Sequence, residues 1–224
     1  MTIDERYRVT LERVRDAAQQ AGKAPDEVAV LAVSKRQEDA AVAALANLGH
    51  RDFGENLVQA WSRRVDRFPE LRWHLIGALQ TNKAAAVASG RPILVHTVDR
   101  PALVDALTKR WSAPAPLDVL LQINVDREPQ KAGCLPEAID QLADHVAASA
   151  ALRLRGVMCI PRPVPGAAPT AAFAHTRRLG EQISDRVAGP PVLSMGMSGD
   201  FEAAIAEGST LIRIGTALFG PRAT

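Results

Sequence analysis

Residues 28–33 read Val-Ala-Val-Leu-Ala-Val, an uninterrupted apolar run that ends directly at Ser34 and Lys35. Such a run lacks the alternation of a strand with one solvent-exposed face, and it is typical of a strand buried on both faces in a parallel sheet. Apolar residues at helical spacing follow from Glu38 to Leu48. The stretch therefore predicts a β-strand followed by an α-helix, which is the repeating unit of α/β proteins.

The same alternation of strand and helix continues along the chain. A leading helix is expected from Asp4 to Gln20, and no helix is expected after the eighth strand. Eight strand units in 224 residues predict an α/β fold of the (β/α)8 TIM-barrel type, with an extra N-terminal helix and a single domain over residues 1–224. An open α/β sheet of seven or eight strands is the alternative. Further strands are expected at 52–53, 72–76, 93–98, 117–125, 154–160, 192–195 and 211–214, and further helices near 56–67, 82–89, 100–111, 135–149, 170–187 and 200–206.

Composition and charge exclude several classes of protein. Hydrophobic residues make up 47% and charged residues 23%, which is a globular balance, and the net charge of +2 provides no overall field for nucleic acid or an anionic membrane. The first residues are charged and lack the apolar stretch of a signal peptide, and no apolar run approaches the roughly 20 residues of a membrane span. The two cysteines, Cys134 and Cys159, have no metal-site spacing. We therefore expect a cytoplasmic protein without metal, and an aromatic content of 4% favours a monomer.

Functional groups of a barrel gather at its carboxyl face, where strands end and loops begin. Lys35 directly follows the apolar first strand. Desolvation at such a position lowers the pKa of an ammonium group from its reference of about 10.4 and frees the neutral amine that attacks carbonyl groups. From position alone, a lysine that simply reaches solvent at the strand end is an equally good interpretation.

The loops after the last two strands are rich in hydrogen-bond donors. Gly196 and Gly199 permit close approach of the backbone, Ser198 offers a hydroxyl, and a helix that begins near Gly199 would direct free N–H groups into the site. The eighth strand leads to Gly215 and Thr216. Barrel enzymes commonly bind phosphate with these two loops, so the pattern favours an anion site. The alternative is that the glycines only form turns and helix caps.

Arg213 lies within the apolar eighth strand, where an arginine is seldom left without a partner. It either forms an ion pair with a carboxylate such as Glu207 or points at a ligand. His74 and His96 lie on predicted strands and are more typical of hydrogen-bonded core histidines than of metal ligands, because no cluster of His, Asp and Glu has metal-site spacing.

Several of these segments, taken together and in order, resemble a known family. They are similar to the pyridoxal 5′-phosphate homeostasis proteins, often called the YggS/PROSC family, whose fold is related to the N-terminal barrel of alanine racemase. The resemblance covers nearly the whole chain. It is carried by the segments Ala32-Val-Ser-Lys35, Phe53-Gly-Glu-Asn56, Trp73-His-Leu-Ile-Gly77, Leu79-Gln-Thr-Asn-Lys83, Leu154-Arg-Gly-Val-Met158, Leu193-Ser-Met-Gly-Met-Ser198 and Arg213-Ile-Gly-Thr216.

The resemblance implies that pyridoxal 5′-phosphate (PLP) is the cofactor and that Lys35 holds it as a Schiff base. It implies a role in intracellular vitamin B6 homeostasis without strong catalytic turnover, with PLP-accepting apo-enzymes as candidate partners. Where related proteins usually read Ser-Asp-Asp-Met, this chain has Ser198-Gly-Asp-Phe201, which removes a side chain from the anion site. The other implied cofactor contacts are a phosphate cradle of Ser198, Gly199, Gly215 and Thr216, Arg213 at the pyridine nitrogen, and Asn56, His74 and Met195 lining the ring pocket.

Two other functions would also use Lys35. A PLP-dependent amino-acid racemase needs a second base, which in the racemase relatives is a tyrosine, and the only tyrosine here is Tyr7 on the leading helix. A Schiff-base aldolase needs an acid/base carboxylate or tyrosine beside the lysine. Lys131, on the loop after the fifth strand, is either a second amine for cofactor capture and release or a solvated lysine. The proline-rich segment 161–169 has no functional interpretation.

Overall fold

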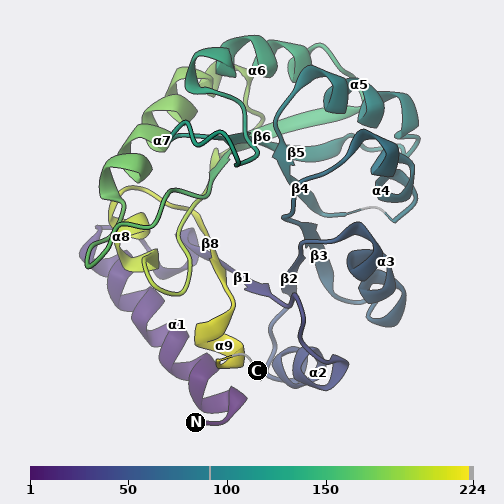
Figure 1. Ribbon diagram of the computed structural model, residues 1–224. Coiled ribbons are helices and arrows are strands. Elements are labelled where there is room, and N and C mark those ends of the chain that lie inside the picture. Colours follow the sequence, from purple (N-terminus) through teal and green to yellow (C-terminus); the bar gives the residue numbers. More distant parts are fainter. Residues whose placement is uncertain (91, 222–224) are drawn as a thin grey trace.

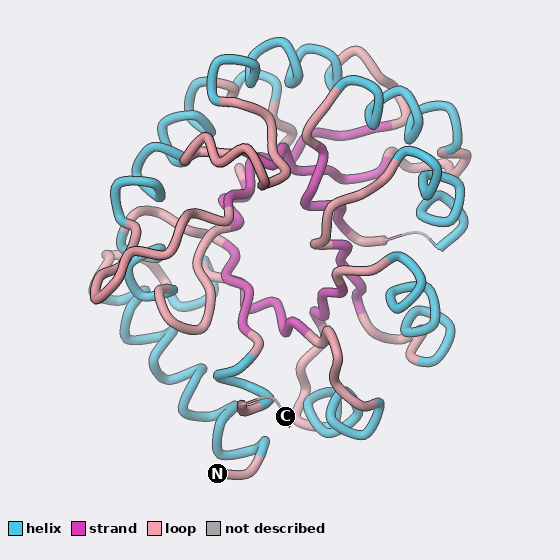
Figure 2. The backbone as a smooth tube through the Cα atoms, in the orientation of Figure 1, coloured by secondary structure: helices cyan, strands magenta, loops and turns pink. Residues whose placement is uncertain are grey.

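The computed structural model describes residues 1–90 and 92–221, and its eight parallel strands close into a barrel in sequence order, β1 to β8. A ring of strands lies inside a ring of helices (Figures 1 and 2). The predicted (β/α)8 barrel is therefore confirmed, and the open sheet is excluded. The strands are β1 (Ala29–Val33), β2 (Asp52–Glu55), β3 (Arg72–Leu75), β4 (Leu94–Val98), β5 (Leu117–Ile123), β6 (Leu152–Cys159), β7 (Val192–Ser194) and β8 (Leu211–Ile214).

The helices follow the strands as expected, with one difference. A short helix, α9, follows β8 and begins at Thr216, where none was predicted. Its four residues are too few to show a helical periodicity in the sequence, and Gly215 is its N-cap. The leading helix α1 packs against both α8 and α9 (Figure 1). The helices are α1 (Ile3–Gln20), α2 (Asp39–Asn47), α3 (Val58–Arg67), α4 (Ala84–Gly90), α5 (Pro101–Arg110), α6 (Ile139–Ala147), α7 (Thr170–Gln182), α8 (Phe201–Ala206) and α9 (Thr216–Phe219).

Strand β1 shows why the barrel strands read as continuous apolar runs. Leu31 and Val33 belong to a cluster inside the barrel, whereas Ala32 belongs to the larger apolar layer between the strands and the helices. Successive side chains of a strand point to opposite faces, so both faces of β1 are buried. The inner cluster consists of Leu31, Val33, Ile76, Leu94, Leu120, Met158 and Leu211.

Strand β2 is longer than the sequence pattern indicated, because Gly54 and Glu55 continue the strand that was expected only at 52–53. A Cβ atom on Gly54 would lie 3.0 Å from Cδ2 of Leu31. A small residue is therefore needed where β2 passes the barrel interior, and glycine does not register as a strand residue in a hydrophobicity pattern.

Asp52 begins β2 at the amino end of the barrel and carries a strongly perturbed carboxyl group. The Nε atom of Arg72 donates to Oδ1 of Asp52 at 2.7 Å, and Nε2 of His74 lies 3.4 Å from the same oxygen. Burial alone raises the pKa of Asp52, but His74 and Arg72 outweigh it and lower the pKa from 3.8 to about 2. The ionised carboxylate therefore stabilises the folded barrel.

Replacing this carboxylate should cost stability in a pH-dependent way. Asp52→Asn should lower the free energy of unfolding by on the order of 2 kcal/mol at neutral pH. Because the folded-state pKa is depressed, the contribution is complete above 3.8 and is lost as the pH falls through about 2. Urea unfolding at a series of pH values should show the two proteins converging in acid. Asp66→Asn, at an exposed aspartate, is the control, and an equal effect of both substitutions would contradict the prediction.

Candidate functional site

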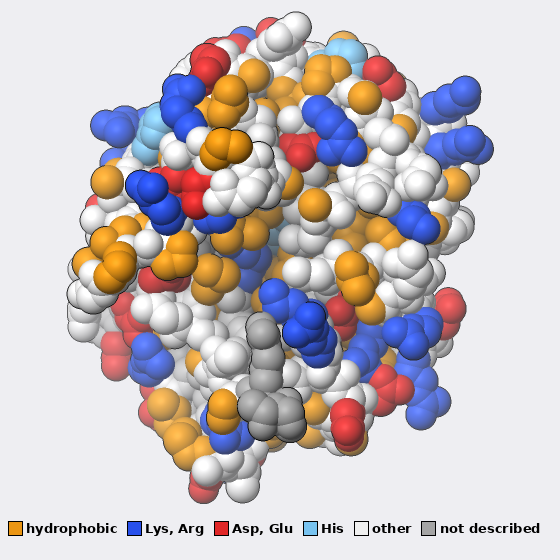
Figure 3. Space-filling model, viewed as in Figure 1, with side chains coloured by type: hydrophobic (Ala, Val, Ile, Leu, Met, Phe, Trp, Pro, Cys, Tyr) orange, Lys and Arg blue, Asp and Glu red, His pale blue; other side chains and the backbone are white. Residues whose placement is uncertain are grey.

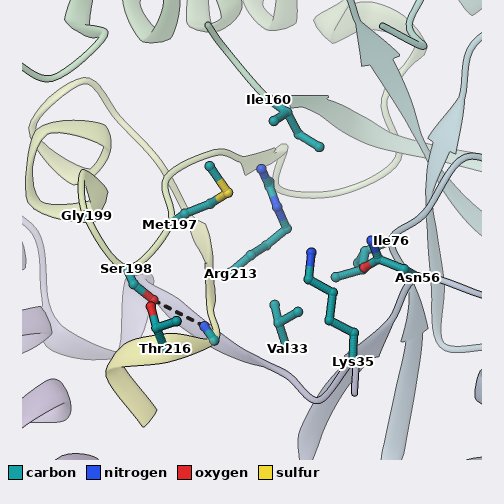
Figure 4. Close-up of a pocket in the computed structure, with 11 residues that line it drawn as sticks. Val33, Lys35, Asn56, Ile76, Ile160, Met197, Ser198, Gly199, Arg213 and Thr216 are labelled. Atoms are coloured by element: carbon teal, nitrogen blue, oxygen red, sulfur yellow. Dashed lines mark hydrogen bonds between the residues drawn. The ribbon is translucent and has the colours of Figure 1, made fainter. Parts of the chain in front are cut away.

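A cavity of about 290 Å³ opens at the carboxyl end of the barrel. Its volume is close to the lower end of the roughly 300–1,000 Å³ of small-molecule clefts. The space-filling view shows a hollow near the centre of this face, with basic side chains beside it (Figure 3). The side chains and backbone that line it come from β1, β2, β3, β6, β7, β8 and the segments after them: Val33, Lys35, Asn56, Ile76, Ile160, Met197, Ser198, Gly199, Arg213, Gly215 and Thr216 (Figure 4).

Lys35 is half-buried and extends into this cavity from the loop after β1 (Figure 4). The backbone on both sides of it is fixed. Ser34 is buried, its N–H donates to the carbonyl of Gly54 at 3.1 Å, and its hydroxyl donates to Oε1 of Glu55 at 2.8 Å. Arg36 adopts a left-handed conformation with φ of 62°, which turns the chain away from the barrel. The lysine is thus held at the cavity rather than at a freely moving strand end.

Glu55 is a residue for which the sequence pattern indicated no role. It is buried, and desolvation raises the pKa of its carboxyl group against the opposing effects of Ser34 and Arg64. Its hydrogen bond with Ser34 anchors the residue before Lys35. A buried carboxylate beside a strand-end lysine is visible in the sequence only as an acidic residue in a strand, which is an uncommon position for that residue type.

Ser198 ties the loop after β7 to the start of α9. Its Oγ accepts a hydrogen bond from the N–H group of Gly215 at 3.3 Å (Figure 4) and another from the N–H group of Ala217 at 3.2 Å. Helix α8 begins at Phe201, two residues later than the expected start near Gly199. The two donor-bearing loops expected from the sequence therefore meet at one side of the cavity.

Gly196 and Gly199 have different structural roles. Gly196 has φ of +93°, and a Cβ there would lie 2.6 Å from Cβ of Ala204. An added Cβ at Gly199 would meet no atom within 4 Å. Packing and backbone conformation thus require the first glycine, while the second leaves open space beside the cavity.

Arg213 reaches the cavity from β8 although its side chain is only 4% exposed. Its Nη1 donates to the carbonyl of Ser194 at 2.6 Å and to Oγ of Ser194 at 2.8 Å, and its Nη2 donates to the carbonyl of Cys159 at 2.8 Å. Within residues 1–90 and 92–221 no carboxylate forms an ion pair with it, so the alternative pairing with Glu207 is not observed. Desolvation lowers the pKa of Arg213, yet a guanidinium stays protonated in proteins.

The remaining two residues expected in the ring pocket, His74 and Met195, do not line this cavity. Met195 is fully buried in the apolar layer between strands and helices, and Met197, two residues later, lines the cavity instead. His74 points into the barrel below the cavity, where its Nδ1 lies 3.0 Å from Nε2 of His96. Side chains alternate between the two faces of a strand only as far as the strand extends. The direction of Met195 and of Met197 therefore depends on the residue at which β7 ends.

Lys131 lies beside the cavity without lining it. It forms an ion pair with Glu128, and its Nζ donates to the carbonyl of Ile160 at 3.4 Å. The side chain of Ile160 lines the cavity. Capture or release of a ligand by Lys131 would require the ion pair with Glu128 to open.

The cysteines and the usual metal-ligand residues do not form a second site in the part of the chain that the structure describes. Cys134 and Cys159 are buried, and burial raises the pKa of their thiols to about 12 and about 11, so they behave as core residues. The described residues contain no group of three or more His, Cys, Asp or Glu that could hold a metal ion. None of the described helices has the length and apolarity needed to cross a bilayer.

Comparison with known proteins relates this geometry to characterised relatives. The family model of the alanine racemase N-terminal domain matches residues 9–223. The pyridoxal phosphate homeostasis protein of Pseudomonas aeruginosa is 46% identical over 225 residues, covering 99% of this chain and 96% of that protein. The structure of PipY from Synechococcus elongatus with PLP bound is 32% identical, with a TM-score of 0.77 over 94% of this chain and 99% of that one. Alanine racemase from Corynebacterium glutamicum shares the fold at 16% identity and a TM-score of 0.73, and the match covers 96% of this chain and 61% of the racemase.

The two glycines after β7 should respond differently to an added methyl group. Gly199→Ala should change the free energy of unfolding by no more than about 0.5 kcal/mol, since the new atom meets open space. Gly196→Ala should cost about 1–3 kcal/mol, because it adds both a close contact and a left-handed alanine. Urea unfolding of both variants checks the prediction. Equal destabilisation would show that Gly199 is also required by the fold.

Proposed function

Because this chain belongs to the alanine racemase N-terminal domain family and to its pyridoxal phosphate homeostasis proteins, we propose that its cavity binds PLP and that the protein acts in vitamin B6 homeostasis. The observation that carries the proposal is the joint presence of Lys35, Arg213 and the two donor-bearing loops around one cavity. When bound, PLP supplies an aldehyde that condenses with a primary amine. Each of these groups of residues fits one part of PLP.

Lys35 is the residue we propose to hold the aldehyde carbon, as a Schiff base through Nζ. It is the only lysine among the residues that line the described cavity. Its neighbours Val33 and Ile76 are apolar and limit access of water to the amine. A primary amine at this position can attack a carbonyl group in its neutral form.

Ser198, Gly199, Gly215 and Thr216 form the proposed phosphate cradle. The open space beside Gly199 accommodates a group at that position, and Gly215 and Thr216 supply backbone at the start of α9. N–H and hydroxyl groups in this arrangement donate charge-assisted hydrogen bonds to an anion. Ser198 also has a structural role, because its Oγ accepts hydrogen bonds from two N–H groups of the segment after β8.

Arg213 is proposed to face the pyridine nitrogen. Three of its five N–H donors are used by the carbonyls of Ser194 and Cys159 and by the Ser194 hydroxyl, which leaves donors for a ligand. A permanently charged donor disfavours a proton on the ring nitrogen. It thereby weakens the electron-withdrawing character that amino-acid chemistry needs, which suits a protein that holds the cofactor without strong turnover.

The racemase alternative lacks its second base at this cavity. Tyr7 lies on α1, and its hydroxyl is 3.5 Å from Nδ1 of His50, which packs edge-on against Phe53. None of the described cavity-lining residues is a tyrosine or a carboxylate. The same absence of an acid/base group counts against a Schiff-base aldolase.

Transfer of the cofactor to PLP-accepting apo-enzymes is the remaining part of the proposal. Lys131 is the candidate second amine, because its Nζ contacts the carbonyl of Ile160, a residue that lines the cavity. We propose that it assists capture or release, and that Lys35 is the resting site.

Lys35→Ala should abolish the visible absorption of the lysine-bound cofactor, because no other lysine lines the cavity. Lys131→Ala is the matched control and should keep that absorption. Absorption spectra after mixing with PLP test this, and borohydride reduction followed by peptide mapping should place the label on Lys35 in the wild type. Unchanged absorption in Lys35→Ala would overturn the assignment.

Phosphate recognition should supply much of the affinity. Losing two charge-assisted hydrogen bonds of about 1.5–3 kcal/mol each should weaken binding of pyridoxal at least roughly 100-fold relative to PLP. Gly199→Ala, which leaves the fold intact, should weaken PLP binding and leave pyridoxal binding unaffected. Fluorescence titrations measure both ligands. Comparable affinities of wild type for the two ligands would contradict the cradle.

A further inference from the structure

A chain of polar side chains crosses the apolar interior of the barrel beneath the proposed cofactor site. Oδ1 of Asp52 lies 3.4 Å from Nε2 of His74, and Nδ1 of His74 lies 3.0 Å from Nε2 of His96. Nδ1 of His96 lies 3.0 Å from Oγ of Ser194, which accepts a hydrogen bond from Nη1 of Arg213 at 2.8 Å. The chain thus connects the amino end of the barrel with the cavity at its carboxyl end.

The middle of this chain is sealed from solvent. His96 and Ser194 are fully buried, and His74 is 5% exposed. His96 projects from β4 and Ser194 from β7, so their contact joins two strands that are not neighbours in the barrel. Polar groups in such a place are costly unless each one is hydrogen-bonded. The proposed binding of PLP involves Arg213 but assigns no role to His74, His96 or Ser194.

The hydrogen positions in this chain follow from its two ends. The guanidinium of Arg213 can only donate, and the ionised carboxylate of Asp52 can only accept. With His74 neutral and its hydrogen on Nε2, which lies 3.4 Å from Oδ1 of Asp52 without forming a geometric hydrogen bond, Nδ1 accepts from Nε2–H of His96. The Nδ1 of His96 then accepts from the hydroxyl of Ser194. Every donor in the chain consequently points from Arg213 toward Asp52.

One added proton reverses the direction of the hydrogen bonds that join His74, His96 and Ser194. When His74 is protonated, both of its nitrogens carry hydrogen, so Nδ1 donates to Nε2 of His96. His96 is neutral, because burial together with the charges of His74 and Arg213 holds its pKa well below 6.5. Its single hydrogen therefore moves to Nδ1 and is donated to Oγ of Ser194, which now accepts from both His96 and Arg213. The two states differ by the one proton gained by His74.

We propose that Ser194, His96 and His74 are positioning residues that hold the Arg213 guanidinium and transmit the protonation state of His74 to it. The proposal rests on the proposed function, in which Arg213 faces the ring of the cofactor. The bound cofactor should therefore sense a proton taken up at the opposite end of the barrel.

Solvent protons have a route to His74. A second cavity, of about 230 Å³, lies at the amino end of the barrel and is lined by His74, Asp52 and Arg72 among apolar residues. The charged or titratable groups that face His74 are Asp52 from β2, Arg72 from β3 and His96 from β4. His50 adds a contact to the carbonyl oxygen of Asp52 at 2.8 Å.

The relay itself can be tested in the protein without cofactor. Nitrogen-15 NMR of histidine-labelled protein, with His145→Gln and His175→Gln used to remove two of the five histidine signals, follows each ring nitrogen across the pH range of the folded state. We expect His96 to stay neutral and to exchange its protonated nitrogen, from Nε2 to Nδ1, at the midpoint where His74 gains its proton. A His96 ring that keeps the same protonated nitrogen throughout would overturn the proposal.

The link to the cofactor is tested by the pH dependence of its absorption in wild type, Ser194→Ala and Ser194→Thr. Wild type should show a spectral shift with the midpoint found for His74 by NMR. Ser194→Thr keeps the hydroxyl and should keep the shift, whereas Ser194→Ala should lose it while its unfolding curve shows an intact fold. The same pH dependence in Ser194→Ala as in wild type would overturn the transmission. Failure of wild type to bind PLP would contradict the proposed function, and the NMR result would still decide on the relay.

Discussion

A guanidinium that is 4% exposed inside an apolar barrel is the constraint on which the site depends. Removing such a charge from water costs several kcal/mol, and within the described residues no carboxylate pairs with Arg213 to offset that cost. The carbonyls of Cys159 and Ser194, which end β6 and β7, accept its hydrogen bonds instead. Because these are parallel neighbouring strands, their carboxyl ends meet where β8 delivers the side chain. The same closure that forms the barrel thus brings together the carbonyl groups that satisfy this arginine.

The two ends of the barrel have different roles, one in stability and the other in ligand binding. At the amino end, Asp52 forms an ion pair with Arg72 and lies beside His74, and this cluster contributes mainly to stability. At the carboxyl end, Lys35 and the loops after β7 and β8 leave donors and an amine for a ligand. This division is common in barrels of this type. The buried histidines join the two ends, so the groups that stabilise one face are in contact with those that orient the other.

The sequence was sufficient for the barrel and for most of the cavity, for reasons that particular residues show. Lys35, Asn56, Ser198 and Arg213 line the cavity as expected, since each lies near the carboxyl end of a predicted strand or on the loop after it. Met195 and Met197 could not be distinguished, because the two methionines differ by two positions and only the end of β7 decides which one leaves the apolar layer. Helix α9 and the second half of β2 were missed because short segments and glycines carry no periodic signal. The contact between His96 and Ser194, on strands separated by 98 positions in sequence, depends on the diameter of the barrel, which no local pattern encodes.

The pairing of β1 with β8 has a consequence for how the protein is made. Lys35 leaves β1, whereas Arg213, Gly215 and Thr216 come from the last strand and the turn after it, so the two halves of the site are roughly 180 residues apart in the chain. They meet only when the final strand docks against the first. A nascent chain on the ribosome therefore cannot assemble this cavity until β8 and the turn after it have been synthesised, and contacts of such large sequence separation are among the slowest to form. Ligand binding by a newly made molecule is accordingly a direct signal that its barrel has closed.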